Sequence, residues 1–269
     1  PYPITQRILD NLSENPRSIQ PALKAEITRL ASEYRYFHWE LAFPEVMTPP
    51  GHYSQDSSEF QSRQTGFDCV LGNPPWERVK LQEKEFFAAR DPEIANATNS
   101  AARTRLINTL PNSNPYLYQQ FLDQKRRAEA SSLLIREGGA FPLCGRGDLN
   151  TYTVFAELNR NLLGPRGRCG CVVPSGIATD DTTKFFFQDL TDSGSLISLY
   201  DFENRKKIFP AVDSRMKFSL LTLSYPSGAA HQADFLFFAH SLTDLKEPLF
   251  LFQLSASDIA LINPNTRTC

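Results

Sequence analysis

Apolar runs and amphipathic segments alternate between residues 148 and 225, and this alternation limits the fold more than any other feature. Residues 169–174 form a continuous apolar run of the kind found in strands covered on both faces. A segment with helical spacing follows at 181–193, and strand-like runs then occupy 195–202 and 217–225. Because strands that alternate with helices usually share one sheet, the pattern predicts an α/β fold with a largely parallel sheet.

The remaining segments are expected to be mostly helical or irregular. Residues 18–43 carry apolar side chains at helical spacing, with Ser18 as the candidate N-cap and Pro21 in the first turn. We further expect a loop at 47–65, a strand at 67–72, helices over 82–137 with a break near 110–115, a helix opening at 148–151, a turn at 164–167 and one more strand at 233–239.

Composition excludes several classes of protein. A length of 269 residues fits one to two domains. The net charge of −2 and the pI of about 6.2 exclude a histone-like or ribosomal binder, whose pI is usually above ~9. No apolar stretch approaches the ~20 residues of a membrane span, and no signal peptide opens the chain. We therefore expect a cytoplasmic protein that does not contact the membrane.

The five cysteines and four histidines show no metal-ligand spacing. The cysteines are odd in number and form no Cys-x-x-Cys pair, which indicates a reduced chain. Cys169 and Cys171 flank one glycine, and we expect their side chains on opposite faces of a strand, where they share no metal. The sequence therefore predicts no metal site.

The tetrapeptide Asn73-Pro74-Pro75-Trp76 directly follows the apolar run 67–72. Two consecutive prolines end a strand or helix, so we expect a stiff loop at the carboxyl end of a strand. Ligands of open α/β sheets bind at that end of the strands. The Asn73 side chain and the backbone carbonyls beside the prolines are hydrogen-bond acceptors in fixed positions, and Trp76 adds a flat aromatic face.

Two acceptors beside an aromatic face suit a planar group that carries an NH2. When such an amine donates hydrogen bonds to both acceptors, its nitrogen moves toward sp3 geometry and its lone pair becomes available. The nitrogen then attacks an electrophilic methyl group, and its proton leaves afterwards without a general base. The tetrapeptide therefore indicates methyl transfer to an exocyclic amine, with a proline-rich turn around a packed tryptophan as the structural alternative.

An Asn-Pro-Pro-aromatic sequence after a Phe-Asp-x-Val-x-Gly strand resembles the catalytic signature of S-adenosylmethionine-dependent amino-methyltransferases. Segment 145–152 with Phe155, and segments 167–176, 201–210 and 217–223, are similar to segments of gamma-class N6-adenine DNA methyltransferases. The methylase polypeptides of type IIG-like restriction–modification and phage-defence systems match them best. Over 67–225 the resemblance implies part of a Rossmann-like class I methyltransferase domain with helical insertions and an antiparallel terminal hairpin.

The resemblance implies transfer of a methyl group from S-adenosylmethionine to N6 of an adenine that is flipped out of double-stranded DNA. Asn73 and Pro74 would accept hydrogen bonds from the target amine, while Pro75 stiffens the loop. Trp76 would stack on one face of the base and Phe209 on the other.

Five further residues complete the implied site. Arg205 and Lys206 adjoin the second stacking ring and are candidates for phosphate contact, with a solvated surface as the alternative. Asp148, Asn150 and Phe155 would lie beside the cofactor. Core packing is the alternative for both Phe155 and Phe209, and a helix N-cap is the alternative for Asp148.

The Gly-rich cofactor loop of this family, and the acidic residue after its second strand, have no counterpart in residues 1–66. Gly164, Gly167 and Gly170 precede a strand instead of following one, so they do not supply the loop. The cofactor site is therefore expected to be incomplete and to need an upstream portion of the same polypeptide. The Pro-Tyr-Pro start and the Asn-Thr-Arg-Thr-Cys end also suggest a fragment of a longer chain.

The expected organisation has three parts. Residues 1–66 form a helical lead-in and a loop. Residues 67–228 form the catalytic part, with a helical insertion at 82–137. Residues 229–269 form a C-terminal extension that leads toward a target-recognition region.

Two other functions remain open. A protein-glutamine N5 methyltransferase of translation factors uses the same tetrapeptide on a side-chain amide, although the helical insertion and Phe209 argue against it. A non-catalytic fragment that only folds or binds DNA is the alternative from a different class, because half of the cofactor site is missing. The DNA recognition sequence and the oligomeric state do not follow from the sequence.

Overall fold

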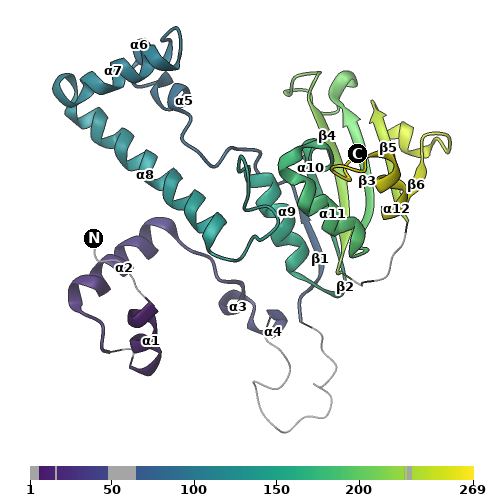
Figure 1. Ribbon diagram of the computed structural model, residues 1–269, viewed down its shortest axis with the longest axis horizontal. Coiled ribbons are helices and arrows are strands. Elements are labelled where there is room, and N and C mark those ends of the chain that lie inside the picture. Colours follow the sequence, from purple (N-terminus) through teal and green to yellow (C-terminus); the bar gives the residue numbers. More distant parts are fainter. Residues whose placement is uncertain (1–5, 16, 48–64, 227, 229–231) are drawn as a thin grey trace. The chain divides into compact units, whose positions relative to one another are not determined.

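The computed structural model describes residues 6–15, 17–47, 65–226, 228 and 232–269. The chain divides into two compact units, Pro1–Arg63 and Gln64–Cys269. The described part of the first unit contains four helices, which are α1 (Gln6–Glu14), α2 (Pro21–Tyr34), α3 (Trp39–Ala42) and α4 (Pro44–Met47) (Figure 1). Most of the loop predicted at 47–65 lies outside the described residues.

The helix predicted over 18–43 is wrong at both ends. Helix α2 begins at Pro21 with Gln20 as its N-cap, because the residue before a proline favours extended backbone and proline fits the first helical position. Ser18 instead donates its hydroxyl to the carbonyl of Asn15 at 2.7 Å. The helix ends where Arg35 takes a left-handed conformation, with φ 49°.

The helical segment predicted over 82–137 is confirmed. It consists of α5 (Glu83–Ala88), α6 (Pro92–Ala95), α7 (Ser100–Ser113) and α8 (Pro115–Glu137). The break falls at Asn114, which caps both helices and accepts a hydrogen bond from the amide of Leu117 at 3.1 Å. The insertion has its own apolar cluster, built around Phe87, Ile107 and Phe121.

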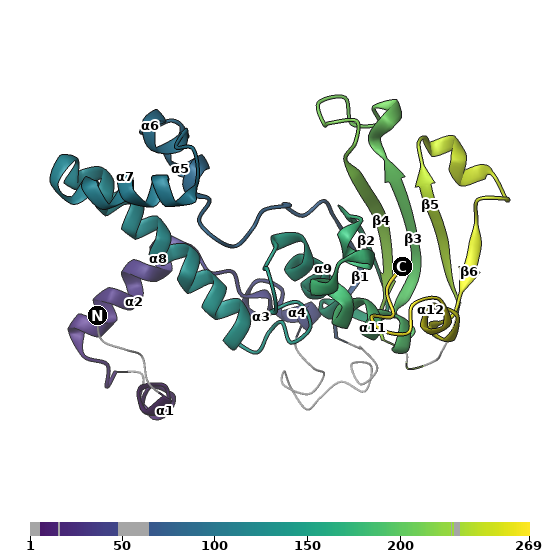
Figure 2. The same cartoon turned by 45° about the horizontal axis from the view of Figure 1, so that its top comes forward.

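A six-stranded sheet forms the centre of the second unit, in the order β1-β2-β4-β3-β5-β6 (Figure 2). The strands are β1 (Phe67–Gly72), β2 (Leu163–Pro174), β3 (Leu196–Glu203), β4 (Lys217–Ser224), β5 (Ala233–Ala239) and β6 (Phe252–Leu254). Strand β1 is parallel to β2 and β3 is parallel to β5, whereas β4 and β6 are antiparallel to their neighbours. Four of the six strands therefore run in one direction, which confirms the α/β fold class, and β3 and β4 form the expected antiparallel hairpin.

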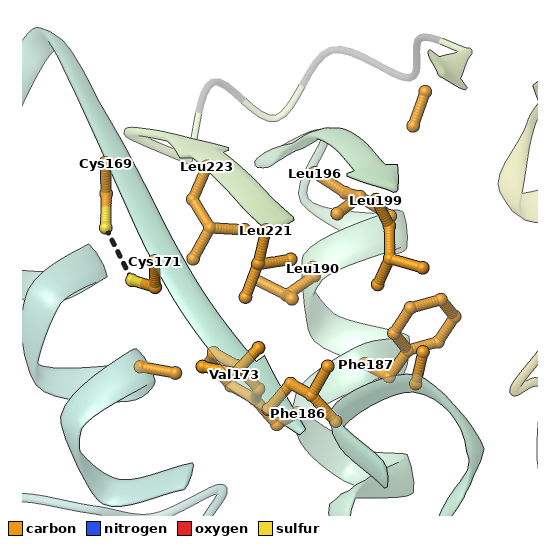
Figure 3. Close-up of a cluster of buried hydrophobic side chains, with 14 of the residues drawn as sticks. Cys169, Cys171, Val173, Phe186, Phe187, Leu190, Leu196, Leu199, Leu221 and Leu223 are labelled. Atoms are coloured by element: carbon orange, nitrogen blue, oxygen red, sulfur yellow. Dashed lines mark hydrogen bonds between the residues drawn. The ribbon is translucent and has the colours of Figure 1, made fainter. Parts of the chain in front are cut away.

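Helices cover one face of this sheet. They are α9 (Thr151–Asn161), α10 (Gly176–Thr179), α11 (Lys184–Asp192) and α12 (Ala256–Ile262). Their buried side chains join those of the strands in one cluster, which includes Phe186, Phe187 and Leu190 of α11 (Figure 3). On the other face, a smaller cluster contains Phe202 and Phe218, with Trp76 packed against it.

The predicted turn at 164–167 is wrong, because β2 runs through it. Phe67 pairs with Leu163 but Cys69 pairs with Arg168, so the extra residues bulge out of the ladder. The backbones approach closely there, and a Cβ on Gly167 would lie 2.4 Å from the carbonyl oxygen of Phe67. The glycines of this segment therefore permit close contact between strands instead of ending a helix. Strand β6 and helix α12 were not predicted.

We expect Phe187→Ala to lower the free energy of unfolding by about 3–5 kcal/mol, because the ring is fully buried and its loss leaves a cavity. Urea denaturation followed by circular dichroism measures the change. Phe185→Ala is the matched control on the same helix; its ring is 41% exposed and contacts Arg146 and Lys184, so about 1 kcal/mol is expected. Equal losses in the two variants would contradict this account of the core.

Candidate active site

The Asn73–Trp76 loop lies at the carboxyl end of β1, as predicted. Pro74 is buried, Asn73 is exposed and Trp76 is half-buried. The indole N–H of Trp76 donates to the carbonyl of Val172 at 3.4 Å, and its ring packs against the sheet clusters. Trp76, the last residue of the loop, therefore attaches the loop to the neighbouring strand β2 near the carboxyl end of that strand.

Thr151, the first residue of α9, holds the other side of the loop. Its hydroxyl donates to the carbonyl of Pro75 at 2.6 Å and accepts from the amide of Glu77 at 3.0 Å. Its backbone amide donates to the Glu77 carbonyl at 2.9 Å. Within the described residues, no hydrogen bond engages the Asn73 side chain or the Pro74 carbonyl. The two acceptors that the sequence analysis predicts are therefore free within the described chain, while the Pro75 carbonyl is occupied.

A cavity of about 250 Å³ opens beside these acceptors. It is lined by Asn73, Pro74, Trp76, Val172, Phe209, Val212, Met216 and Phe218. The structure thus brings Phe209 to the same cavity as the tetrapeptide, although more than 130 residues separate Trp76 from Phe209. The ring of Phe209 packs edge-on against Phe218, with centroids 5.0 Å apart and planes at 70°. It is 37% exposed, so core packing does not account for all of its surface.

Asn204, fully buried, holds the segment that carries Phe209. Its side-chain oxygen accepts from the Phe209 amide at 2.9 Å. Its side-chain nitrogen donates to the carbonyls of Phe209, Val212 and Asp213 at 3.0, 3.1 and 3.3 Å. Sequence reasoning assigned no role to Asn204 or to Thr151, although both lie inside the segments that carry the resemblance. The only signal in the sequence for these two roles was the presence of a polar residue, Asn204 or Thr151, within each of the segments.

Arg205 and Lys206 do not line this cavity. Both belong to the short 3-10 helix Asn204–Lys206, and both side chains are exposed. Arg205 forms an ion pair with Glu203 at 2.7 Å, and this hydrogen bond lowers the pKa of Glu203. The two basic side chains stand on the surface next to the segment of Phe209.

The three expected cofactor residues have separate surroundings. Asn150 is the N-cap of α9 and accepts from the amide of Tyr152 at 3.4 Å, so the alternative of Asp148 as the N-cap is wrong. Asp148 pairs with Lys80 at 2.9 Å and with Arg78 at 3.6 Å. Phe155 is 41% exposed, so it is not a core residue.

The role of these three residues toward S-adenosylmethionine stays a prediction. None of the three lines the cavity that contains Asn73. The polar side chains of Asp148 and Asn150 already have partners in the protein. The ring of Phe155, by contrast, is partly exposed and is available for contact with a ligand.

The expectation for Cys169 and Cys171 was wrong. Side chains two residues apart in a strand share a face, and these two sulfur atoms lie 3.1 Å apart (Figure 3). Their hydrogen bond lowers the pKa of Cys171 to about 7 and raises that of Cys169. Even so, the described residues contain no group of three or more His, Cys, Asp or Glu side chains placed to hold a metal. His52 and His231 lie outside the described residues.

Comparison with known proteins adds a family match. Residues 3–125, less than half of the chain, match the family model described as the Eco57I restriction-modification methylase, and this segment includes the Asn73–Trp76 loop. No curated protein matches the chain. No helix in the described part of the chain is both long and apolar enough to cross a membrane.

Several solved structures are similar at low identity. A type I restriction-modification methyltransferase subunit from Streptococcus thermophilus is 14% identical over 52% of this chain and 34% of its own, with a TM-score of 0.39. The type IIG restriction endonuclease BpuSI is 17% identical over 53% of this chain and 18% of its own, with a TM-score of 0.37. The Type ISP enzyme LlaBIII bound to DNA is 10% identical over 66% of this chain and 10% of its own, with a TM-score of 0.33. The chain thus spans about a third or less of these proteins.

We expect Asn204→Asp to lower the free energy of unfolding by about 2–3 kcal/mol, because a carboxylate cannot donate to the three carbonyls that the amide now satisfies. Hydrogen exchange across residues 209–213 should also become faster, because this segment loses the donor to its carbonyls, although the carboxylate can still accept from the Phe209 amide. Urea denaturation and exchange measured by NMR test both effects. Asn112→Asp on the exposed surface of α7 is the control, and an Asn204→Asp protein as stable as that control would refute the role of Asn204.

We expect Lys80→Met to raise the pKa of Asp148 toward its ordinary value, because the hydrogen bond from Lys80 is the main cause of its lowered pKa. A lowered pKa means that the pair stabilises the fold above the pKa of the unfolded state and loses this effect as the pH falls through the folded pKa. A carboxyl-carbon NMR titration measures the shift. Lys84→Met, on the neighbouring helix α5, should leave the titration of Asp148 unchanged.

Proposed function

We propose that this chain is the catalytic part of a site-specific DNA methyltransferase. In this proposal a methyl group passes from S-adenosylmethionine to N6 of an adenine flipped out of double-stranded DNA, in restriction–modification or phage defence. The observation that carries the proposal is the cavity in which Asn73, Pro74, Trp76 and Phe209 come together. The family match over residues 3–125 supports a DNA methyltransferase in general, and adenine N6 is our assignment from the site.

The free acceptors suit an exocyclic amine. The Asn73 side-chain oxygen and the Pro74 carbonyl would each accept one N–H of the amine, and the prolines keep the backbone from moving away. With both N–H groups held by these acceptors, the lone pair of the nitrogen would point out of the base plane and be available for attack on an electrophilic methyl group. The amine would lose its proton after attack, so this chemistry needs no general base in the cavity.

The two aromatic rings suit the flat faces of a base. Trp76 and Phe209 both line the cavity, and each is attached to the protein by a separate contact, the Val172 carbonyl for Trp76 and the Asn204 side chain for Phe209. A base between them would be stacked on both faces, which is the arrangement used for extruded bases. Arg205 and Lys206, exposed beside this segment, are our candidates for contact with the DNA phosphates.

Completion of the cofactor site is part of the proposal. S-adenosylmethionine would supply an electrophilic methyl group, and Phe155, whose ring is 41% exposed, is our candidate to pack against it. Because Asp148 and Asn150 already have partners, we propose that an upstream portion of the same polypeptide supplies the remaining contacts. The proposal keeps the three-part organisation at 1–66, 67–228 and 229–269 and a cytoplasmic location.

Asn73→Ala in the complete polypeptide should lower methyl transfer to DNA by at least ~10²-fold, because one of the two acceptors of the amine is lost. Trp76→Ala should also lower it strongly. The measurement is N6-methyladenine in unmethylated genomic DNA after incubation with S-adenosylmethionine, by mass spectrometry of the nucleosides. Asn112→Ala, an exposed asparagine of α7, is the matched control and should retain full activity.

Normal methylation by the Asn73→Ala protein would refute the assignment. Methylation of glutamine in translation-factor peptides, with none in DNA, would favour the protein-glutamine methyltransferase instead. Wild-type protein that binds DNA but methylates neither substrate would favour the non-catalytic alternative. Circular dichroism melting of each variant separates loss of chemistry from loss of fold.

A further inference from the structure

A second cavity, of about 400 Å³, lies on the opposite face of the sheet from the one that contains Asn73. Phe218 lines the first cavity and Ser219 lines the second, and consecutive residues of a strand face opposite sides. The wall of the second cavity comes from β3, β4, β5, β6, α10, α12 and the residues Thr268 and Cys269. Strands β4, β3, β5 and β6 lie next to one another in the sheet (Figure 2). Its size falls in the range of small-molecule sites.

The wall is mainly apolar but contains one buried carboxylate. Leu199, Phe237, Phe252 and Ile259 contribute apolar surface, whereas Asp201 is only 4% exposed. A carboxylate buried among such side chains is costly unless it is paired or hydrogen-bonded. The acid therefore requires a partner, and its two oxygens differ in how far the protein provides one.

Two serine hydroxyls donate to one oxygen of Asp201 and leave the other without a partner. Ser219 donates to Oδ1 at 3.1 Å and Ser175 donates to the same atom. In the described chain no hydrogen bond reaches Oδ2, and no cationic side chain lies within 4.0 Å of the carboxylate. Asp201 is the only carboxylate side chain among the residues that line the cavity. The cavity thus contains one available anionic acceptor.

The backbone opposite Asp201 is distorted in a way that enlarges the apolar wall. Tyr200 pairs with Leu236 and Phe202 pairs with Ala239, so two residues of β5 face one residue of β3. These two residues are Phe237 and Phe238, and both line the cavity. Phe238 has φ +60°, a conformation that costs a non-glycine residue of order 1 kcal/mol or more. Bulges of this kind re-aim side chains next to functional sites.

We propose that this cavity binds a small, mainly apolar molecule that carries one protonated amine. The amine donates to Oδ2 of Asp201, and the apolar body packs against Leu199, Phe237 and Phe252. Lys217 also lines the cavity; its ammonium lies 4.9 Å from the centre of the Phe238 ring, where cation–π contact holds it. The positive charge of Lys217 weakly repels any cationic ligand, so the attraction of Asp201 has to outweigh this repulsion and a second cationic group on the ligand is disfavoured. This site is independent of the proposed methyl transfer, because it shares no residue with the first cavity.

Binding to the full chain should be measured by NMR with hexylammonium as the probe and 1-hexanol as its uncharged analogue. We expect hexylammonium to bind at least about tenfold more tightly than 1-hexanol. Asp201→Asn should remove this difference while 1-hexanol binds as before. Asp123→Asn on α8, the matched control, should leave both affinities unchanged.

Equal affinities for the amine and the alcohol, or no binding of either, would overturn the proposal. Lysine capped at both backbone ends, with a free side-chain ammonium, imitates a lysine of a protein. If it binds more tightly than hexylammonium, the small-molecule assignment is overturned in favour of a protein lysine. If the Asp201→Asn protein does not fold, hexylammonium binding to Lys217→Met tests the proposal instead, since this exposed residue is not needed for the core. Loss of its repulsion should raise the affinity for hexylammonium about twofold or more, and unchanged or weaker binding would count against the site.

Discussion

The register of β4 is the constraint on which both cavities depend. This strand is hydrogen-bonded on both sides, to β2 and to β3, and runs antiparallel to each. Its consecutive residues Phe218 and Ser219 face the two sides of the sheet. Phe218 therefore lines the cavity that contains Asn73, and Ser219 lines the cavity that contains Asp201. A slip by one residue would exchange these faces and place a hydroxyl beside Trp76 and a phenyl ring beside Asp201. Pairing on both sides makes such a slip costly.

The strands were predictable from the sequence because their signals are local. The apolar runs at 67–72 and 217–225 and the double proline after the first of them each determine structure within a few residues, and the structure confirms them. The sequence predictions were wrong where contact with a residue far away in the chain determines the local structure. Residues 164–167 read as a turn, but contact with Phe67 draws them into the ladder. Helix α12 had a local signal, the capping box of Ser255 and Asp258, that sequence reasoning did not use.

In the candidate site, too, some residues have local sequence signals, whereas the roles of others depend on the fold. The tetrapeptide predicts a chemistry by itself, because the acceptors and the ring belong to consecutive residues. Thr151 was not predictable as the residue that holds this loop, since its partner Pro75 lies 76 residues away. Asn204 acts on carbonyls only five to nine residues ahead, but its role depends on the fold of that segment. The error over Cys169 and Cys171 had another origin, a mistaken side-chain period within a strand that was itself correctly placed.

Separate attachment of the two aromatic rings bears on the energetics of the proposed reaction. Trp76 is fixed through the Val172 carbonyl, and Phe209 through Asn204 and the edge of Phe218. Neither ring depends on the other, so folding alone brings the two to the same cavity before any ligand arrives. Ordering flexible side chains at a binding site costs about 0.5–1.5 kcal/mol for each one immobilised. Since the protein has already restrained both rings, more of the stacking energy of a flipped base remains to offset the cost of removing that base from the duplex.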